Sequence, residues 1–454
     1  MATRVSRTAT TSTNETKFTW SAWVKKAKTG TGMMLIYNYL DGNNRGYLQF
    51  DTNDKLYYYD KEGGTKKAEF TTAATYKDCS AYYHICVIVD TTDGTEADRL
   101  QLYVNGVRQT FSAWTYPSSS ATLGFKTDTG TNYVSIGVNS DSTSNPFEGI
   151  MSHIHYVDGI DYPATTFGQT DSTTGEWSIK TSSGISTADY GNNGYFILKD
   201  GNSVTDQSGN SHNFTVNTGT LTKSEDCPSN IFATFNPLLK TPGGLSYSNG
   251  NTTLTTTNTQ WEGSISTLAP TKGKWYWEAK YNTGSGIKLD IVRQQADMRF
   301  FNTSNNSYGS YSSDGYGYQL NNSGTDYYSN AGTTTTWNSS INSNSTKTYM
   351  IAVDLDNGKM WFGANGTWAN TSGTANPATG TDPRLSFSAK LNGEPWFFTM
   401  SCEGSGSSHN ANFGNGYFGT TAVSSAGTNA SGIGIFEYDV PAGFTALCTK
   451  GLNE

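Results

Sequence analysis

The sequence predicts an all-β protein built from two tandem β-sandwich domains of the jelly-roll type. Forty-nine glycines, 13% aromatic residues and only 15% charged residues in a chain of 454 residues are typical of a β protein with many turns. We find no convincing run of apolar residues at the helical spacing i, i+3, i+4, i+7. A pair of strands joined by a turn or loop occurs in each half of the chain, which indicates two domains of related architecture.

The clearest strand pair is VDLDNGKMWFGANG (Val353–Gly366) in the second half of the chain. Its apolar residues alternate with polar ones, Asp356-Asn357-Gly358 has the chemistry of a hairpin turn, and Asn365-Gly366 ends the second strand. A looser version lies in the first half, where the strand Val87–Asp90 is followed by a longer loop and the strand LQLYVNG (Leu100–Gly106). These pairs predict hairpins at both places.

The first half continues as a series of short strands separated by Asn, Asp and Gly. In Lys17–Lys26 (KFTWSAWVKK), four apolar side chains fall on one face with a period of two: Phe18, Trp20, Ala22 and Val24. Further strands are expected at 33–40, 46–51, 55–60, 82–90, 100–111, 134–139 and 147–159. This even spacing of short strands predicts a sandwich rather than alternating strands and helices.

Composition and charge exclude several classes of protein. A net charge of −8 without a basic block argues against a nucleic-acid ligand, and no stretch approaches 18 consecutive apolar residues, so no membrane insertion is expected. The first residues contain no hydrophobic segment, so no secretory signal is expected either. The five cysteines (79, 86, 227, 402 and 448) have no CxxC spacing, which favours reduced thiols in a protein made in a cytoplasm, with Cys86 in a core.

The sequence does not predict an enzyme or a metal site. Glycoside hydrolysis needs two facing carboxylates, but the alternating acid pairs here, Glu96 with Asp98 and Asp354 with Asp356, lie in or beside turns. His153 and His155 share a strand face without further ligands nearby in the sequence. No cofactor is predicted, although three acidic loops have the composition of calcium sites: 41–44, 51–54 and 90–98.

The candidate ligand-binding residues are aromatic side chains between Asn302 and Lys347. Seven of them are surrounded by Ser, Asn, Gly and Thr: Tyr308, Tyr311, Tyr316, Tyr318, Tyr327, Tyr328 and Trp337. This is the composition of binding loops, where rigid rings supply contact area and small polar residues supply hydrogen bonds. The alternative is that these are ordinary strand residues at the edge of a Gly-rich sheet. In the first domain, Tyr57–Tyr59, Trp114 and Tyr116 could also contact a sugar, or could cover the ends of the sandwich.

Motifs in both halves resemble known domain families. WSAWVKK, SAYYHICVIVDTT, RLQLYVNGV and FEGIMSHIHYVDG, in this order, resemble a laminin-G-type, concanavalin A-like lectin/glucanase domain. GKWYWEAKY, VDLDNGKMWFGANGTW, EPWFFTMSCEG and NANFGN resemble a SPRY domain. FGQTDSTTGEWSIK, GNNGYFILKD and DQSGNSHNFTV are similar to a segment of structural proteins of marine bacteriophages, and so is the end of the chain, FEYDVPAGFTALCTKGLNE.

The resemblance implies a fold and a function. It predicts a concanavalin A-like sandwich over residues 1–225, a linker and entry strand over 226–260, and a SPRY-like sandwich over 261–454. It implies a non-enzymatic virion protein, made in the host cytoplasm and displayed in several copies as a homo-oligomer on a fibre or capsid projection. Its partners would be other virion structural proteins and a host-surface polysaccharide. The alternative is a structural decoration or tail component without a host ligand.

Overall fold

The chain forms two compact units, Met1–Lys223 (unit 1) and Ser224–Glu454 (unit 2). The computed structural model describes residues 2–125, 133–139, 144–199, 203–241, 243–293, 315–321, 326–337, 341, 347–369 and 372–453. Within these ranges the elements are almost all β-strands, with one short α-helix, α1 (Thr449–Leu452), near the end of the chain. None of the described helices is long and apolar enough to cross a membrane.

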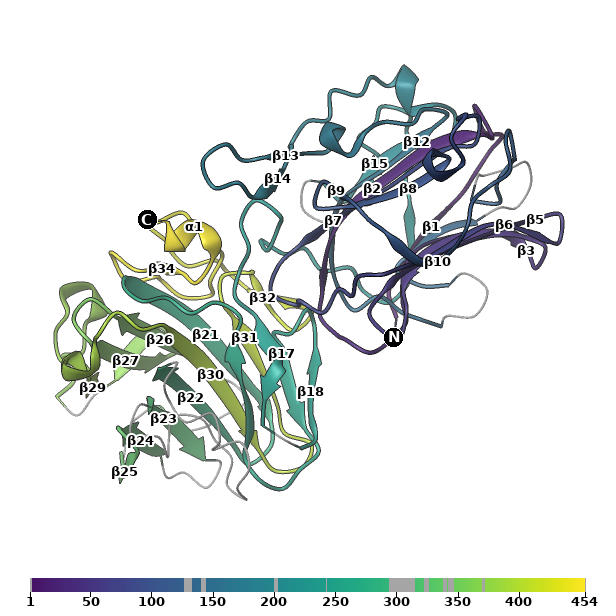
Figure 1. Ribbon diagram of the computed structural model, residues 1–454. Helices are drawn as coiled ribbons and strands as arrows, with labels where there is room; N and C mark the ends of the chain where they lie inside the picture. The colour runs from purple at the N-terminus through teal and green to yellow at the C-terminus, as the bar shows by residue number, and fades with distance from the viewer. Residues whose placement is uncertain are drawn as a thin grey trace. The chain divides into compact units, whose positions relative to one another are not determined.

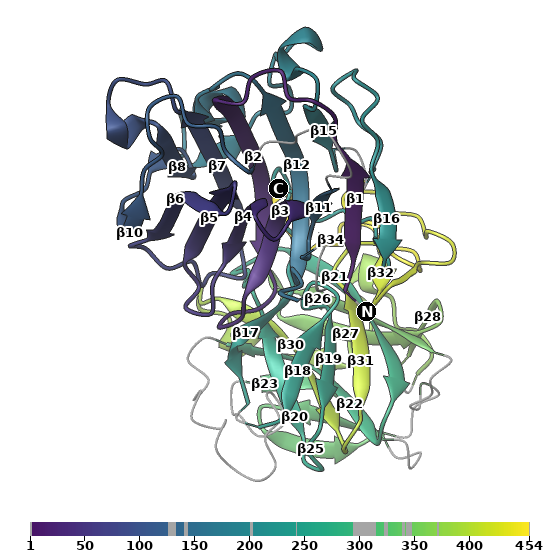
Figure 2. The same cartoon turned by 90° about the vertical axis from the view of Figure 1, so that its right-hand side faces the viewer.

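Unit 1 contains two antiparallel sheets, seen edge-on in Figure 1. The eight-stranded sheet has the order β10-β6-β5-β4-β3-β11-β1-β16, which can be followed in Figure 2. Its strands are β1 (Arg4–Thr8), β3 (Met33–Asp41), β4 (Asn44–Phe50), β5 (Leu56–Glu62), β6 (Thr65–Thr72), β10 (Phe111–Thr115), β11 (Tyr133–Ile136) and β16 (Thr215–Thr218). The six-stranded sheet, β15-β12-β2-β7-β8-β9, consists of β2 (Lys17–Lys26), β7 (Tyr83–Asp90), β8 (Leu100–Val104), β9 (Val107–Arg108), β12 (Gly149–Asp158) and β15 (Tyr195–Ile197).

The core of unit 1 lies between these two sheets. The predicted inner face of β2 is confirmed, because Phe18, Trp20, Ala22 and Val24 are all buried in this core. The opposite face of β2 is buried as well, including Trp23. A third layer covers that face, formed by the short helices η2 (Ala164–Thr166) and η3 (Ala188–Tyr190) and the hairpin of β13 (Gly168–Thr170) and β14 (Trp177–Ile179).

Two buried histidines attach this third layer to the six-stranded sheet. The indole Nε1–H of Trp177 donates to Nδ1 of His84 over 3.0 Å, so the His84 proton lies on Nε2, which donates to Ser21 Oγ over 2.8 Å. Nδ1 of His155 pairs with the Tyr190 hydroxyl over 2.7 Å. Burial lowers the pKa of His84 to about 3 and the pKa of His155 well below its usual value, so both rings are neutral near pH 7.

Unit 2 is also built from two large sheets (Figure 1). The first has the order β17-β20-β30-β22-β23-β24-β25. The second has the order β18-β19-β31-β21-β26-β27-β28, with β29 paired to β27 and β34 paired to β21 in addition. The seven-stranded sheet contains β17 (Phe235–Lys240), β20 (Glu262–Ser266), β22 (Gly286–Arg293), β23 (Gly315–Asn321), β24 (Asp326–Asn330), β25 (Thr333–Thr336) and β30 (Trp396–Glu403). The nine-stranded sheet contains β18 (Leu245–Ser248), β19 (Thr253–Thr256), β21 (Lys274–Thr283), β26 (Thr348–Asp354), β27 (Lys359–Ala364), β28 (Thr367–Ala369), β29 (Leu385–Ser386), β31 (Ser408–Asn412) and β34 (Thr445–Ala446). A small pair, β32 (Tyr417–Phe418) and β33 (Thr421–Ala422), and two short helices, η5 (Pro377–Thr379) and η6 (Ser388–Lys390), lie outside these sheets.

Both predicted hairpins are present. β26 and β27 pair from Asp354 with Lys359 onward, on either side of the predicted turn. β7 pairs with β8 across the longer loop, which contains the short helix η1 (Glu96–Asp98). Residues 226–260, predicted as a linker and entry strand, lie inside unit 2 and supply β17, β18 and β19.

Unit 2 has apolar clusters on both faces of its nine-stranded sheet. Alternate residues of β21 point to opposite sides, so Trp275 and Trp277 lie in the core between the sheets and Tyr276 lies in a second cluster outside it. The second cluster is completed by residues of the last part of the chain, among them Phe436, Val440 and Phe444. The C-terminal segment therefore covers this sheet on its outer side.

Candidate functional site

The structure changes the interpretation of the predicted aromatic site in unit 2. Tyr308 and Tyr311 lie outside the described residues. Tyr316, Tyr318 and Trp337 are only 2%, 1% and 2% exposed and belong to the core between the two sheets. Their burial favours the alternative interpretation, that they are strand residues, and corrects the expectation that these three rings are open to a ligand.

Strand β23 explains why these rings point inward. In its sequence GYGYQLN, Tyr316, Tyr318 and Leu320 alternate with smaller or polar residues, and all three face the core. The Tyr318 hydroxyl donates to Asp326 over 2.8 Å, and its ring packs 5.0 Å from Trp337. A Tyr-Gly-Tyr stretch that resembles a binding loop is thus a core strand whose tyrosine hydroxyl has a buried acceptor.

Tyr327 and Tyr328 on β24 are half-buried and face opposite sides of the sheet. Tyr328 pairs with Tyr318 and packs against the core. Tyr327 pairs with Gln319, and its ring lies on the face of the sheet that points away from the core. Among the described residues of the predicted aromatic set, Tyr327 therefore remains a candidate ligand contact.

Arg384 stabilises the edge of the sheet where Tyr328 lies. Its guanidinium is 3.8 Å from the ring centroid of Tyr328 and 4.6 Å from that of Trp337. Stacking of this kind contributes roughly 0.5 to 2 kcal/mol per ring, and we expect Arg384→Met to lower the free energy of unfolding of unit 2 by about 1 to 2 kcal/mol. Urea unfolding, with hydrogen exchange of β24 and β25 as the local readout, measures this. An Arg384→Met variant as stable as wild type would contradict this prediction, and Arg384→Lys, which keeps the charge, separates the contribution of the planar stack.

Unit 1 presents a larger set of aromatic residues that point away from its core. Six tyrosines lie on the outer face of the eight-stranded sheet, and we call them the tyrosine face: Tyr37 and Tyr39 on β3, Tyr47 on β4, Tyr57 and Tyr59 on β5, and Tyr133 on β11. Alternation with core residues fixes this orientation, since Leu48 and Tyr58 on the same strands are fully buried. Tyr133 is 46% exposed, Tyr37 is buried by its neighbours, and the other four are half-buried.

Five rings of the tyrosine face, those on β3, β4 and β5, form a continuous band across neighbouring strands. The centroid of Tyr47 lies 5.5 Å from Tyr37 and 5.4 Å from Tyr59, with interplanar angles of 29° and 27°. Tyr39 lies 5.7 Å from Tyr37, and Tyr57 lies 5.9 Å from Tyr47. The contacting rings run from β5 to β3, about 9 to 10 Å for two strand spacings, and Tyr133 on β11 pairs with Tyr39 one strand further along. This length suits a short oligosaccharide better than a single sugar.

Polar groups lie beside the rings. The Tyr57 hydroxyl donates to Glu69 Oε1 over 2.7 Å, and Lys66 donates to the other carboxylate oxygen over 2.7 Å. Partial burial raises the pKa of Glu69, but the hydrogen bonds from Lys66 and Tyr57 lower it by more, so the carboxylate stays charged. Arg45 lies over the Tyr59 ring at 5.9 Å, and Gln49 lies on the same face of β4.

This arrangement has the chemistry of a sugar-binding surface. Aromatic rings provide faces for the C–H groups of a sugar, while Arg45, Gln49 and Glu69 provide donors and acceptors for its hydroxyls. Trp114, which the sequence also indicated as a possible sugar contact, pairs with the core residue Phe70. It therefore lies on the opposite face of this sheet from the tyrosine face. Its side chain is 55% exposed.

Among the described residues, no three His, Cys, Asp or Glu side chains come together as a metal site would require.

Of the tyrosine face, the sequence indicated Tyr57 and Tyr59 as possible sugar contacts but not the tyrosines of the neighbouring strands. YNY at 37–39 and YYY at 57–59 place tyrosines two residues apart, on one side of a strand. Which strands lie side by side is set by long-range pairing, so the sequence pattern alone does not show that these pairs join Tyr47 in one band.

One protein-family model matches the chain, described as the concanavalin A-like lectin/glucanases superfamily and covering residues 2–159. This match lies within unit 1 and includes all six residues of the tyrosine face. No curated protein matches the chain.

Solved structures with low sequence identity are similar to parts of the chain. The PSpry domain of TRIM65 is 14% identical, with a TM-score of 0.31, over 40% of this chain and 88% of that one. The SPRY domain of human HERC1 is 15% identical, with a TM-score of 0.27, over 39% and 96%. A native heptameric SAP-like pentraxin from Limulus polyphemus is 13% identical, with a TM-score of 0.27, over 36% and 72%.

All three TM-scores lie below 0.5, so the description of the fold rests on the sheets of the chain itself. No catalytic family is identified among the matches. The chain is an all-β protein of two tandem β-sandwich units, the first of which carries the concanavalin A-like lectin match.

Proposed function

We propose that this chain is a non-enzymatic surface protein of a bacteriophage virion that binds a host-surface glycan through the tyrosine face of unit 1. The observation that carries the proposal is the band of contacting tyrosine rings on the outer face of the eight-stranded sheet, flanked by Arg45, Gln49 and Glu69. A contiguous aromatic surface of this kind often marks a ligand or partner site.

Two further observations support the glycan as the ligand. The family match over residues 2–159 is to a superfamily described as lectins and glucanases. The net charge of −8, together with the mixed charges beside the rings, favours a neutral or weakly charged polymer over a polyanion. The placement on a virion is supported by the resemblance of residues 167–217 and of the C-terminal segment to phage structural proteins.

Display in several copies would strengthen this binding. A shallow surface that stacks against sugar rings buries little area per copy, and weak contacts gain strongly when several act together. The proposal therefore includes association of several chains on one fibre or capsid projection, next to other virion proteins.

The test is binding of the purified chain to a panel of immobilised bacterial surface polysaccharides and to intact host cells. Saturable retention on at least one polysaccharide, lost when its sugar rings are opened by periodate oxidation, is the expected result. Antibodies against the chain should label the outside of virions. If the chain is built into virions but is retained by neither polysaccharide nor cells, it is a structural component, and the tyrosine face is a contact with another virion protein.

A further inference from the structure

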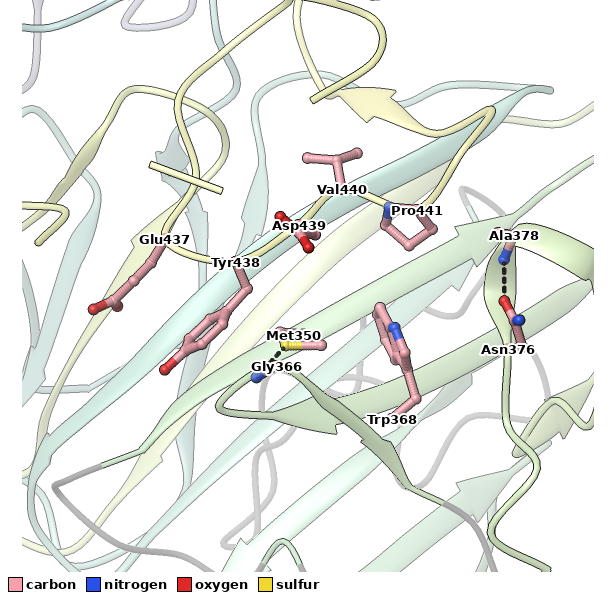
Figure 3. Close-up of a pocket in the computed structure, with 10 residues that line it drawn as sticks. All are labelled: Met350, Gly366, Trp368, Asn376, Ala378, Glu437, Tyr438, Asp439, Val440 and Pro441. Carbon is pink, nitrogen blue, oxygen red and sulfur yellow. Dashed lines mark hydrogen bonds between the residues drawn. The ribbon is translucent and has the colours of Figure 1, made fainter. Parts of the chain in front are cut away.

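Unit 2 contains a pocket on the outer side of its nine-stranded sheet, where the C-terminal segment crosses β26 and β28. Its volume is about 330 Å³, at the lower end of the range for small-molecule sites. Met350 forms part of its wall, with Trp368 and Tyr438 on either side of it in Figure 3. Asp439 lies over the gap between these two rings in the same view.

The wall formed by the C-terminal segment is held in place by a buried carboxylate. Glu278 on β21 accepts hydrogen bonds from the backbone N–H groups of Glu437 and Tyr438, over 2.9 and 2.8 Å. The ring of Tyr438 then lies over Gly366, where a Cβ atom would come within 3.1 Å of it. The pocket is thus preformed rather than dependent on a ligand.

One carboxylate oxygen at the mouth of this pocket has no hydrogen-bond partner among the described residues, and it belongs to the exposed side chain of Asp439. Oδ1 of Asp439 accepts from the backbone N–H and the hydroxyl of Thr428, over 2.7 and 2.8 Å, whereas Oδ2 accepts no hydrogen bond from a described residue. The same bonds from Thr428 lower the pKa of Asp439, so it is ionised at neutral pH. The Glu437 carboxylate turns away in Figure 3 and is bonded to Thr348 and Ser424.

The pocket therefore combines two aromatic rings with one uncompensated negative charge. The residues that line it include two acids and no lysine, arginine or histidine. Aromatic faces and a carboxylate both attract a cation. Trp368 and Tyr438 are half-buried, whereas Asp439 is exposed, so its charge acts at the mouth of the pocket. Neutral ligands would use the rings but would leave the charge of Asp439 unmatched.

We infer that this pocket binds an alkylammonium group, such as that of a lysine side chain or an amino sugar. A guanidinium group favours a carboxylate with both oxygens open, because it donates two parallel hydrogen bonds. Asp439 offers a single open oxygen, which matches the point charge of an ammonium group. This site lies in unit 2 and does not depend on the proposed role of the tyrosine face.

The inference is tested by calorimetric titration of the full chain with matched pairs of probes. N-acetyl-lysine methylamide is compared with its neutral isostere N-acetyl-norleucine methylamide, and glucosamine is compared with N-acetylglucosamine. We expect at least one ammonium probe to bind saturably and about tenfold or more tightly than its neutral counterpart. Binding of the lysine probe alone identifies a peptide side chain as the source, and binding of glucosamine alone identifies a glycan.

Two variants locate the site. Asp439→Asn removes the charge while keeping the acceptor for Thr428, and we expect it to weaken ammonium binding about tenfold. Asp171→Asn is the matched control, because Asp171 likewise accepts hydrogen bonds from the backbone but belongs to unit 1 and does not line the pocket, and it should change the affinity less than about twofold. Thermal unfolding confirms that both variants are folded. Equal binding of charged and neutral probes, no saturable binding of either ammonium probe, or an unchanged affinity in folded Asp439→Asn would each overturn the inference.

Discussion

Replacing Lys26 with methionine is expected to lower the free energy of unfolding of unit 1 by about 3 to 5 kcal/mol, because it leaves the buried carboxylate of Asp54 without its cation. The ammonium group of Lys26 donates to Asp54 Oδ1 over 2.7 Å and to the Tyr76 carbonyl over 2.8 Å. The side chains of Lys26 and Asp54 are almost inaccessible to solvent, at 0% and 3% exposure. Asp54 also accepts from the backbone N–H of Gly30. Removal of the cation leaves this carboxylate buried with a single neutral donor.

Two variants control this prediction. Lys28 forms a similar pair with Glu148, but the side chains are 50% and 39% exposed, and Lys28→Met should cost less than about 1 kcal/mol. The double variant Lys26→Met/Asp54→Asn should regain part of the loss, since no charge then remains to be buried. The prediction fails if urea unfolding shows that Lys26→Met costs no more than Lys28→Met.

Acid is expected to weaken unit 1 through His84. The folded-state pKa of His84 is about 3, below its ordinary value near 6.5, so the unfolded chain binds a proton at pH values where the folded chain does not. The stability that this histidine contributes is therefore complete above about pH 7 and is lost as the pH falls from 6.5 towards 3. Protonation of Nδ1 would also set a second N–H group against the indole N–H of Trp177 and weaken the attachment of the third layer.

A comparison with the His84→Asn variant is needed because another group in unit 1 titrates in the opposite sense. Burial raises the pKa of Asp60 to about 7, so this carboxyl group favours the folded state as the pH falls. We expect the change from pH 7.5 to pH 4.5 to cost wild-type unit 1 about 2 to 3 kcal/mol more than it costs the His84→Asn variant. Denaturant unfolding at both pH values, with hydrogen exchange of β7 as the readout for unit 1, gives this difference. Equal pH dependence in the two proteins would contradict the role of His84.

Local sequence signals predicted the elements whose structure depends on neighbouring residues. Turn chemistry placed the hairpin of β26 and β27, and alternation placed the inner face of β2. The expectation that Cys86 is a core residue is confirmed by its complete burial. In each case the signal and the structure lie within about ten residues of each other, so no knowledge of the rest of the chain is needed.

The features that the sequence did not predict depend on which segments pack together. Composition suggested that Tyr316 and Tyr318 belong to a binding loop, but the neighbouring strand β22 and the opposite sheet make them core residues. The third layer over β2 is formed by residues about 140 positions later in the chain, and only the folded unit shows that Trp177 packs on His84. The tyrosine face likewise requires the register of four strands.

The most direct test of the central claim compares the glycan affinity of wild type with that of a Tyr47→Ala/Tyr59→Ala variant. The ligand is the polysaccharide that the wild-type chain retains best, and Trp114→Ala is the control, because Trp114 is an exposed aromatic residue on the opposite face of the same sheet. Each ring contributes about 0.5 to 1.5 kcal/mol of stacking, so the double variant should bind about tenfold more weakly or worse, while the control binds as wild type does. Unchanged affinity in a folded Tyr47→Ala/Tyr59→Ala variant would show that the tyrosine face is not the glycan site.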